Sequence, residues 1–511
     1  MRRPAFTALA GVLAAASGLL TACGDRQPSR SSPPNAGPRA ATIAVGALPR
    51  TLDPARASSV AERAIAAATQ TPLLTYRRTA GDEAATLTPA LAGALPQLSL
   101  DAREYRFQLR RGLVYADGAL VKASDVERAI AHASADATDG ELRTVLASIV
   151  GAPSRDGATL SGVRSDDRSG MVVVRLRHAD GRVPFALADP ATAPQPSLPK
   201  AGEIPASTGP LRIASSSKRS VVLAANPLRA TISTVPAARL AQLSLVLRPS
   251  GASARELAGG TVDLDLTAAA VSSRGSARGA RASAATLVTG PSTSVVAAVV
   301  AQRGALAART VRRALAAAID RRDAGSAASG AAPTCGLLPP FAVGAVDREP
   351  CPAPPAAPLR RLLTGVQVTV AVPRGEAWSA ATEAILREAI DALGGTASFA
   401  ASRAPLEAAA SGAADIAVAR VTPRLPHPSF WLEPAASFDA LLAREVPRLT
   451  AGPLTGTGGR WAALDRRVVD RGVVMPLLAL ERVAVVGRQV DRRTVLLHPL
   501  FGLDLAALDL A

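Results

Sequence analysis

Residues 104–130 read EYRFQLRRGLVYADGALVKASDVERAI, and this stretch carries more fold information than any other part of the chain. Apolar and polar residues alternate over residues 104–109, which predicts a half-buried strand. Asp117-Gly118 then supplies a turn. Ser124 and Glu127 form a capping-box pattern in front of apolar residues that share one helical face, so we expect a helix to begin there.

Strand and helix patterns alternate in the rest of the chain as well. The order strand, helix, strand near the carboxyl end is typical of a βαβ unit with a parallel strand pair. The chain is therefore predicted to be a mixed α/β protein. The expected strands are 172–176, 221–223, 366–372 and 416–418, and the expected helices are 311–319 and 385–393.

Length and charge exclude several classes of protein. The chain has 511 residues, enough for several domains, and a formal net charge of +17. Its lysines, Lys122, Lys200 and Lys218, follow Val, Pro and Ser, so none can belong to a phosphate-binding P-loop. The arginines are scattered and only 3% of residues are aromatic, which argues against nucleic-acid binding.

The amino terminus predicts export and lipid anchoring. Arg2 and Arg3 precede an apolar run over residues 8–20, which is too short to span a bilayer and suits a signal peptide. The run ends in Leu20-Thr21-Ala22-Cys23, which resembles a bacterial lipoprotein signal. We therefore expect a signal peptide at 1–22, a lipid on Cys23 and a flexible linker at 23–40; an ordinary secretion signal with a chance cysteine is the alternative.

Export also bears on the other two cysteines. Cys335 and Cys351 would share an oxidising compartment, so we expect a disulfide between them, with two free thiols as the alternative. No metal or other cofactor is predicted, because the histidines show no metal-ligand spacing. They are His132, His178, His427 and His498.

The order of motifs resembles the family 5 extracellular solute-binding proteins, the dipeptide, oligopeptide and nickel receptors of ABC importers. Residues 87–92 (LTPALA), together with the strand, turn and helix start of residues 105–126, are similar to the family's signature block. The resemblance covers nearly all of residues 41–505. Its other segments are 208–210, 226–227, 311–321, 337–340, 415–418, 426–429 and 474–477.

The resemblance implies an α/β fold of the type II periplasmic-binding-protein kind, with two lobes, a hinge and an inserted domain. It also implies a monomeric receptor, lipid-anchored on the outer face of the cell membrane, that binds a peptide-like or other small solute and delivers it to ABC permease subunits. The alternative is a non-transport surface lipoprotein with a diverged pocket, which senses a peptide signal or binds an envelope partner. The implied boundaries are 41–72, 196–285 and 482–511 for lobe I, 73–195 for the inserted domain and 286–481 for lobe II.

The resemblance places the ligand between two extended segments, whose backbone groups would pair with an extended peptide. Ordinary buried strand is the alternative for each position. The implied ligand-binding residues are Val45, Gly46, Ala47, Ala417, Val418, Ala419, Arg420, Thr422, Arg424 and His427.

The predicted site departs from the family at two positions. Arg424 stands where peptide receptors of the family carry an aspartate for the ligand's amino group, and His427 replaces a second acidic or polar residue. A guanidinium there would repel an ammonium and favour anionic ligands. The alternative is that Arg424 points into solvent. Nickel is poorly supported by so few histidines.

An exported hydrolase is the remaining alternative. Ser215 to Lys218 has a Ser-x-x-Lys spacing, but it falls in a polar turn between predicted strands. We therefore predict that the protein is not an enzyme.

Overall fold

The computed structural model describes residues 39–152, 160–267, 285–321, 330–345, 351, 361–453 and 456–511. Residues from Pro38 onward form one compact unit. The predicted signal peptide, Cys23 and nearly all of the linker lie outside the described residues. Within the described part, no helix combines the length and apolar character needed to cross a bilayer.

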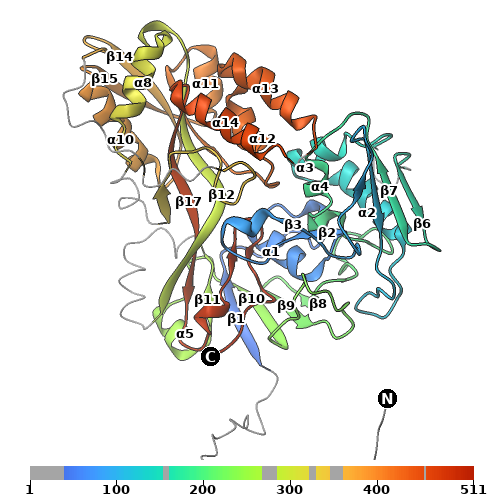
Figure 1. The fold of residues 1–511 in the computed structure, drawn as a ribbon. Helices are drawn as coiled ribbons and strands as arrows, with labels where there is room; N and C mark the ends of the chain where they lie inside the picture. Colours follow the sequence, from blue (N-terminus) through green and yellow to red (C-terminus); the bar gives the residue numbers. More distant parts are fainter. Residues whose placement is uncertain are drawn as a thin grey trace, which may run out of the picture. The chain divides into compact units, whose positions relative to one another are not determined.

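A mixed sheet of 11 described strands forms the framework of this unit (Figure 1). Its main path has the order β15-β14-β16-β12-β17-β11-β1-β10-β9-β8, and β13 pairs with β17 beside that path. The strands are β1 Ala40–Val45, β8 Leu211–Ser216, β9 Ser220–Ala225, β10 Gln242–Leu247, β11 Leu264–Asp265, β12 Thr286–Val300, β13 Ala331–Pro333, β14 Gln367–Pro373, β15 Thr396–Ser402, β16 Ile416–Val421 and β17 Val474–Val486.

Two long antiparallel strands, β12 and β17, connect the two sides of this sheet (Figure 1). Their register runs from Thr286 opposite Val486 to Val299 opposite Val474, with irregularities between Pro291 and Val295 and between Val296 and Ala297. On one side β17 pairs with β11, and on the other β12 pairs with β16. A pair of strands that crosses between two sheet regions is the connection expected of a two-lobed binding protein with a hinge.

On the amino-terminal side, β1 pairs in parallel with β10, which continues antiparallel through β9 to β8. Helices α1 (Val60–Thr69) and α5 (Ala254–Gly259) belong to this side. Ile43, Leu223, Leu245 and Leu264 belong to its apolar core. The strand expected at 221–223 is confirmed within β9.

On the other side, the predicted βαβ unit is confirmed, with a correction to its partners. Strand β14 is followed by α10 (Ser379–Ala392) and then by β15, which pairs in parallel with β14. The sequence pattern predicts the second strand at 416–418. That segment lies in β16, which also pairs in parallel with β14 but on its other edge. Strand β15 was missed because its sequence, TASFAAS, is rich in small residues and none of its side chains is fully buried.

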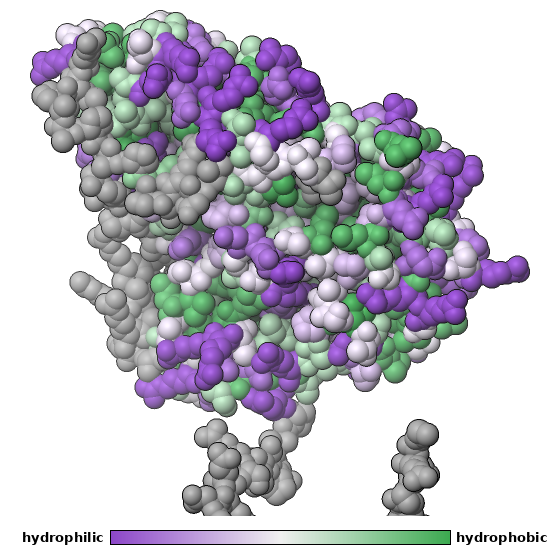
Figure 2. Space-filling view, in the orientation of Figure 1, coloured by the Kyte–Doolittle hydropathy of each residue, from purple (hydrophilic) through white to green (hydrophobic). Residues whose placement is uncertain are grey.

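Helices cover both faces of this second region. Helix α8 (Arg309–Ala318) and α10 share a core with β14, built around Leu315, Leu386 and Val370. Helix α13 (Ala440–Thr450) buries Leu442 and Leu449 and leaves its arginines exposed. Figure 2 shows strongly hydrophilic residues over α13 and α14 (Gly458–Asp470), as expected of amphipathic surface helices. Helices α11 (Pro405–Ser411) and α12 (Ser429–Leu432) complete the group.

A separate four-stranded sheet, ordered β4-β5-β7-β6, lies in the region predicted to be the inserted domain. The strand predicted from alternation is confirmed as β5, which buries Tyr105 and Phe107. The strand predicted at 172–176 is β7. The elements are β4 Gln97–Leu98, β5 Glu104–Gln108, β6 Val163–Asp166, β7 Met171–Arg175, α2 Ala123–Asp136, α3 Gly140–Leu146 and α4 Val183–Ala186.

The predicted capping box at the start of α2 is wrong. The helix begins before Ser124, and the Asp125 carboxylate accepts a hydrogen bond from the Lys122 backbone N–H at 3.0 Å. The Ser124 hydroxyl instead donates to Asp167 at 2.9 Å. A tertiary partner therefore takes the side chain that the local pattern had assigned to the helix end.

Short elements complete the described chain. They are the strands β2 Leu74–Tyr76, β3 Leu87–Pro89, β18 Leu497–His498 and β19 Gly502–Leu503, and the 3₁₀ helices η1 Pro54–Arg56, η2 Asp82–Ala85, η3 Pro190–Thr192, η4 Gly304–Ala307, η5 Glu433–Phe438 and η6 Arg492–Thr494.

Candidate ligand-binding site

A cavity of about 760 Å³ lies against the crossing strands. Its wall comes from η2, the middle of β12, the middle of β17, and β13 with the segment that follows it. These elements come from all three predicted domains or their borders. A cavity of this size is within the range that holds a small-molecule ligand.

The wall of this cavity, which we call the hinge cavity, mixes apolar and polar groups. Leu338 and Phe341 supply apolar surface, and Ser292 supplies a hydroxyl. The charged residues on its described wall are Asp82 and Glu481. Partial burial raises the pKa of Glu481 above its ordinary value, because a desolvated carboxylate loses the water that stabilises its charge.

The disulfide predicted between Cys335 and Cys351 is confirmed, with 5.7 Å between the two Cα atoms. Cys335 lines the hinge cavity. The bond closes a loop between residues 16 positions apart and so restrains one end of the cavity wall.

A second feature is a buried ion pair between Arg424, after β16, and Asp189, before η3. The Arg424 Nε donates to one carboxylate oxygen at 2.7 Å, and Nη2 donates to the other at 2.8 Å. The remaining nitrogen, Nη1, donates to the Ala57 carbonyl at 2.8 Å. Arg424 is only 6% exposed. This pair joins segments predicted to belong to lobe I, lobe II and the inserted domain.

Other charged groups surround the ion pair. The Glu141 carboxylate accepts from the backbone N–H groups of Arg424 at 2.9 Å and Leu425 at 3.3 Å. Burial first, and then the neighbouring Asp139 charge, raise the pKa of Glu141 to about 7. Arg63 lines a cavity of about 10 Å³ beside the pair, with room for about one water.

The electrostatics fix the charge state of the pair. Burial alone would raise the pKa of Asp189, but the charge and hydrogen bonds of Arg424 hold it below its ordinary value. Each of the three guanidinium nitrogens of Arg424 therefore donates to a protein oxygen. The sequence-based preference for anionic ligands assumed a free guanidinium, and it no longer follows from this residue.

His427 lies in a buried aromatic cluster. Its ring packs edge-on against Phe185, Phe430 and Trp461. Its Nδ1 accepts from the Ser429 backbone N–H at 3.3 Å. Burial lowers the pKa of His427 to about 3, so the ring is neutral at physiological pH. Its predicted ligand contact stays a prediction.

The remaining predicted residues occupy the ends of two strands. Val45 is buried at the end of β1, and Gly46 and Ala47 are exposed just beyond it. In β16, Ala417, Val418 and Ala419 are buried and Arg420 is exposed, and Thr422, just beyond the strand, is also exposed. None of these eight residues lines the hinge cavity or the small cavity beside Arg63.

Strand β16 nevertheless offers an edge to a ligand. Its residues from Val418 to Val421 pair with β12, whereas β14 pairs with β16 only at Ile416 and Ala417. Within the described residues, the second edge of β16 is therefore unpaired from Val418 onward. An unpaired edge is what backbone recognition of an extended peptide requires.

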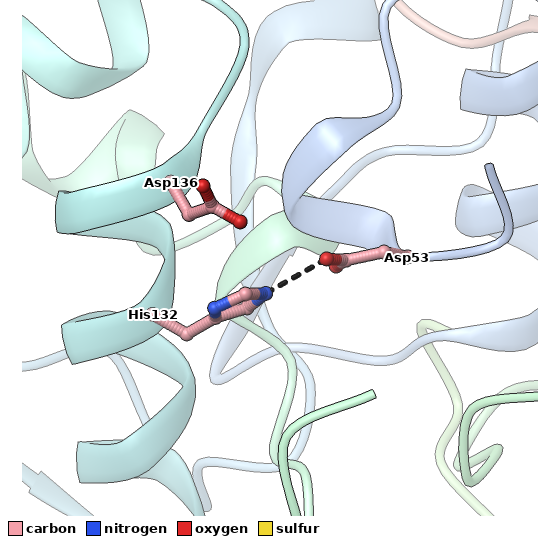
Figure 3. A group of neighbouring side chains, drawn as sticks. All are labelled: Asp53, His132 and Asp136. Atoms are coloured by element: carbon pink, nitrogen blue, oxygen red, sulfur yellow. Dashed lines mark hydrogen bonds and ion pairs between the residues drawn. The ribbon is translucent and has the colours of Figure 1, made fainter. Parts of the chain in front are cut away.

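A group of side chains near η1 has the composition of a metal site (Figure 3). The ligand atoms of Asp53, His132 and Asp136 all lie within 4.8 Å of one another. His132 Nε2 is 2.8 Å from Asp53, and Arg56 forms ion pairs with both Asp53 and Asp136. Ion pairing among these groups accounts for their arrangement without a metal.

Sequence reasoning missed Asp82, Glu481, Asp189 and Glu141. Each is an ordinary acidic residue in its local sequence, and only long-range packing brings it to a cavity or to Arg424. For Asp189, the family comparison at Arg424 could have prompted a search for a buried acidic partner.

Comparisons with known proteins agree with this architecture. The clavulanic acid biosynthesis oligopeptide binding protein 2 has a TM-score of 0.75 at 20% identity, with 93% of this chain and 96% of that chain covered. The periplasmic murein tripeptide binding protein MppA, in its unliganded open form, also has a TM-score of 0.75, at 16% identity over 93% of this chain and 98% of that chain. The ABC transporter substrate-binding protein CtaP of Listeria monocytogenes has a TM-score of 0.71 at 17% identity, over 92% and 99% of the two chains.

At these identities the structural matches show the fold, which is the two-lobed α/β fold expected from the sequence. A search of curated protein sequences finds no match. A family match covers residues 86–435, from the signature block through the hinge strand β12 to η5. The chain therefore belongs to the bacterial extracellular solute-binding proteins of family 5, which bind solutes for ABC transporters and are not enzymes.

Proposed function

We propose that this protein is the lipid-anchored, extracytoplasmic substrate-binding component of an ABC importer, and that it delivers a peptide-like or other small solute to permease subunits. The observation that supports this proposal best is the hinge cavity of about 760 Å³ in a family 5 fold. Anchoring would come from lipid on Cys23, and the receptor would act as a monomer.

The hinge strands suggest how binding would be signalled. The hinge cavity is lined by both β12 and β17, so a ligand held there contacts the strands that connect the two sides of the sheet. A ligand can shift a conformational equilibrium only through contacts that differ between the two states. Contacts with hinge residues would differ between the open and closed states, because hinge residues change their backbone geometry when the lobes move.

We further propose the domain boundaries and site residues inferred from the sequence. The unpaired edge of β16 from Val418 supports backbone pairing with an extended ligand. Gly46 and Ala47, exposed at the end of β1, would contact the ligand from the other lobe.

One observation favours a second candidate function. The Asp189 carboxylate accepts hydrogen bonds from two nitrogens of the Arg424 guanidinium. Arg424 stands at the position where peptide receptors of the family are expected to bind the ligand's amino group. If this ion pair prevents binding of an amino group, the protein no longer serves transport. It would serve instead as a surface lipoprotein that senses a peptide signal or binds an envelope partner.

A thermal-shift screen of the full-length protein in detergent tests the primary proposal. The panel should contain peptides, sugars and metal ions. A ligand at 100 times its Kd is expected to stabilise the folded protein by about 2.7 kcal/mol, which raises the unfolding temperature measurably. No shift with any class would contradict a receptor for small solutes and leave the envelope-partner function.

Genes for permease and ATPase subunits beside this gene would favour import. An isolated gene would favour the sensing function.

A further inference from the structure

The hinge cavity has an unusual charge balance for this protein. Basic residues outnumber acidic ones by 58 to 41 in the whole chain. Yet the charged side chains on the described wall are both acidic, Asp82 from η2 and Glu481 from β17. In the part of the chain that the structure describes, neither carboxylate has an ion-pair partner among the basic residues.

Glu481 is held in place by its backbone. Its N–H donates to the Gly330 carbonyl at 2.7 Å, and it lies opposite Pro291 in the β12–β17 ladder. Its neighbour Leu480 pairs with Ala331 of β13, so strands flank this segment on both sides. The carboxylate is thus presented from a rigid element at the cavity wall, in a partly desolvated position.

A partly buried carboxylate that pairs with no cation among the described residues favours a ligand that brings one. Desolvation weakens the interaction of water with the carboxylate, and it strengthens attraction to a positive group inside the cavity. Apolar groups such as Leu338 and Phe341 on the same wall would hold the body of such a ligand.

We propose that the hinge cavity binds solutes through a positively charged amine or guanidinium group, which pairs with Glu481 and is supported by the charge of Asp82. This inference rests on the proposed receptor function and names its ligand class. It assigns the cation-binding position to the hinge, away from Arg424, and it reverses the charge preference expected from the sequence alone.

Two matched ligand pairs test the proposal. The first is an N-acetylated, amidated Ala-Arg-Ala tripeptide against the same peptide with citrulline in place of arginine, which removes the charge and keeps the shape. The second is trialanine amide with a free amino group against its N-acetylated form. Calorimetry on the full-length protein is expected to show that at least one cationic member binds about tenfold or more tighter than its neutral partner.

Variants of the acidic wall residues show which carboxylate causes the preference for the cationic peptide. Glu481→Gln is expected to abolish that discrimination by weakening the binding of the cationic peptide, and continued binding of the neutral peptide separates a lost charge contact from a collapsed cavity. Asp82→Asn should reduce the discrimination in part. Glu83→Gln is the control, because Glu83 lies in the same short helix but pairs with Arg77 and does not line the cavity.

The outcomes separate this inference from the proposed function. If neutral or acidic solutes bind and the cationic members show no advantage, the receptor function stands and the cation inference is overturned. It is equally overturned if discrimination survives in Glu481→Gln. If no solute of any charge binds, both proposals fail.

Discussion

The ion pair between Arg424 and Asp189 should couple distant parts of the chain through a large interaction free energy. We consider the change Asp189→Asn, which removes the charge but keeps an oxygen for the hydrogen bond from the Ala191 N–H. Arg424 would keep the Ala57 carbonyl and, through Nη2, the amide oxygen as partners, but it would lose the hydrogen bond from Nε at 2.7 Å and the opposing charge. Removing one partner of a buried ion pair lowers the free energy of unfolding by roughly 3–5 kcal/mol.

A double-mutant cycle isolates the pair. Arg424→Met should cost a similar amount, because it leaves a buried carboxylate without its partner. The double variant should cost much less than the sum of the single variants, since neither uncompensated charge remains. We expect a coupling free energy of at least about 2 kcal/mol, near the upper part of the range for contacting residues.

Urea unfolding of the full-length protein, followed by tryptophan fluorescence, measures these values. Trp431 and Trp461 are buried in the core of the region that follows Arg424 and report its unfolding. Arg420→Met is the matched control: Arg420 pairs with Glu376 near the surface, with 43% of its side chain exposed, and should cost less than about 1 kcal/mol.

Two results would refute the reasoning about this pair. One is additivity of the two single variants to within about 0.5 kcal/mol. The other is a cost for Asp189→Asn no larger than that of Arg420→Met. The pH dependence gives an independent check. The folded pKa of Asp189 is depressed, so its contribution is present above the ordinary value of 3.8 and is lost as the pH falls below it.

Three other perturbations have definite expected outcomes. Cys335 and Cys351 should resist alkylation until the protein is reduced and unfolded. Replacing both by alanine should lower the free energy of unfolding by about 3 kcal/mol. Labelling of either cysteine without reductant, detected by mass spectrometry, would contradict the bond. Cys23→Ser should remove the acyl mass and release the protein from the membrane fraction, whereas unchanged fractionation and mass would argue against lipidation. Between about pH 4.5 and 7 the folded protein holds a proton on Glu141 that the unfolded chain releases, so stability should fall as pH rises across this window. Glu141→Gln should remove that slope, and equal slopes in denaturant titrations of both proteins would show that Glu141 is not its source.

Local sequence patterns determined much of the framework. Alternation predicted β5 and β14, the apolar segment 172–176 predicted β7, and the apolar stripe predicted α8. These patterns succeed because burial of one face follows directly from residue spacing. The motif order identified the family and with it the two-lobed fold.

Local patterns failed where a partner lay far along the chain. Ser124 matched a capping box, but Asp167, 43 residues away, takes its hydroxyl. Strand β15 has no clear alternation, and pairing with β14 makes it a strand. Sheet pairing and side-chain competition are tertiary effects, so spacing in the sequence does not contain them.

The sequence by itself determined that this protein is a family 5 solute-binding protein with a mixed α/β fold, and it placed an arginine where an aspartate was expected. Only the tertiary structure decided what that arginine does, by bringing Asp189 to it from 235 positions away. The same folding leaves Glu481 and Asp82 on the wall of the hinge cavity without a basic partner among the described residues. The charge that a binding site presents to a ligand depends on which charges the protein has already paired, and this pairing is decided by three-dimensional packing.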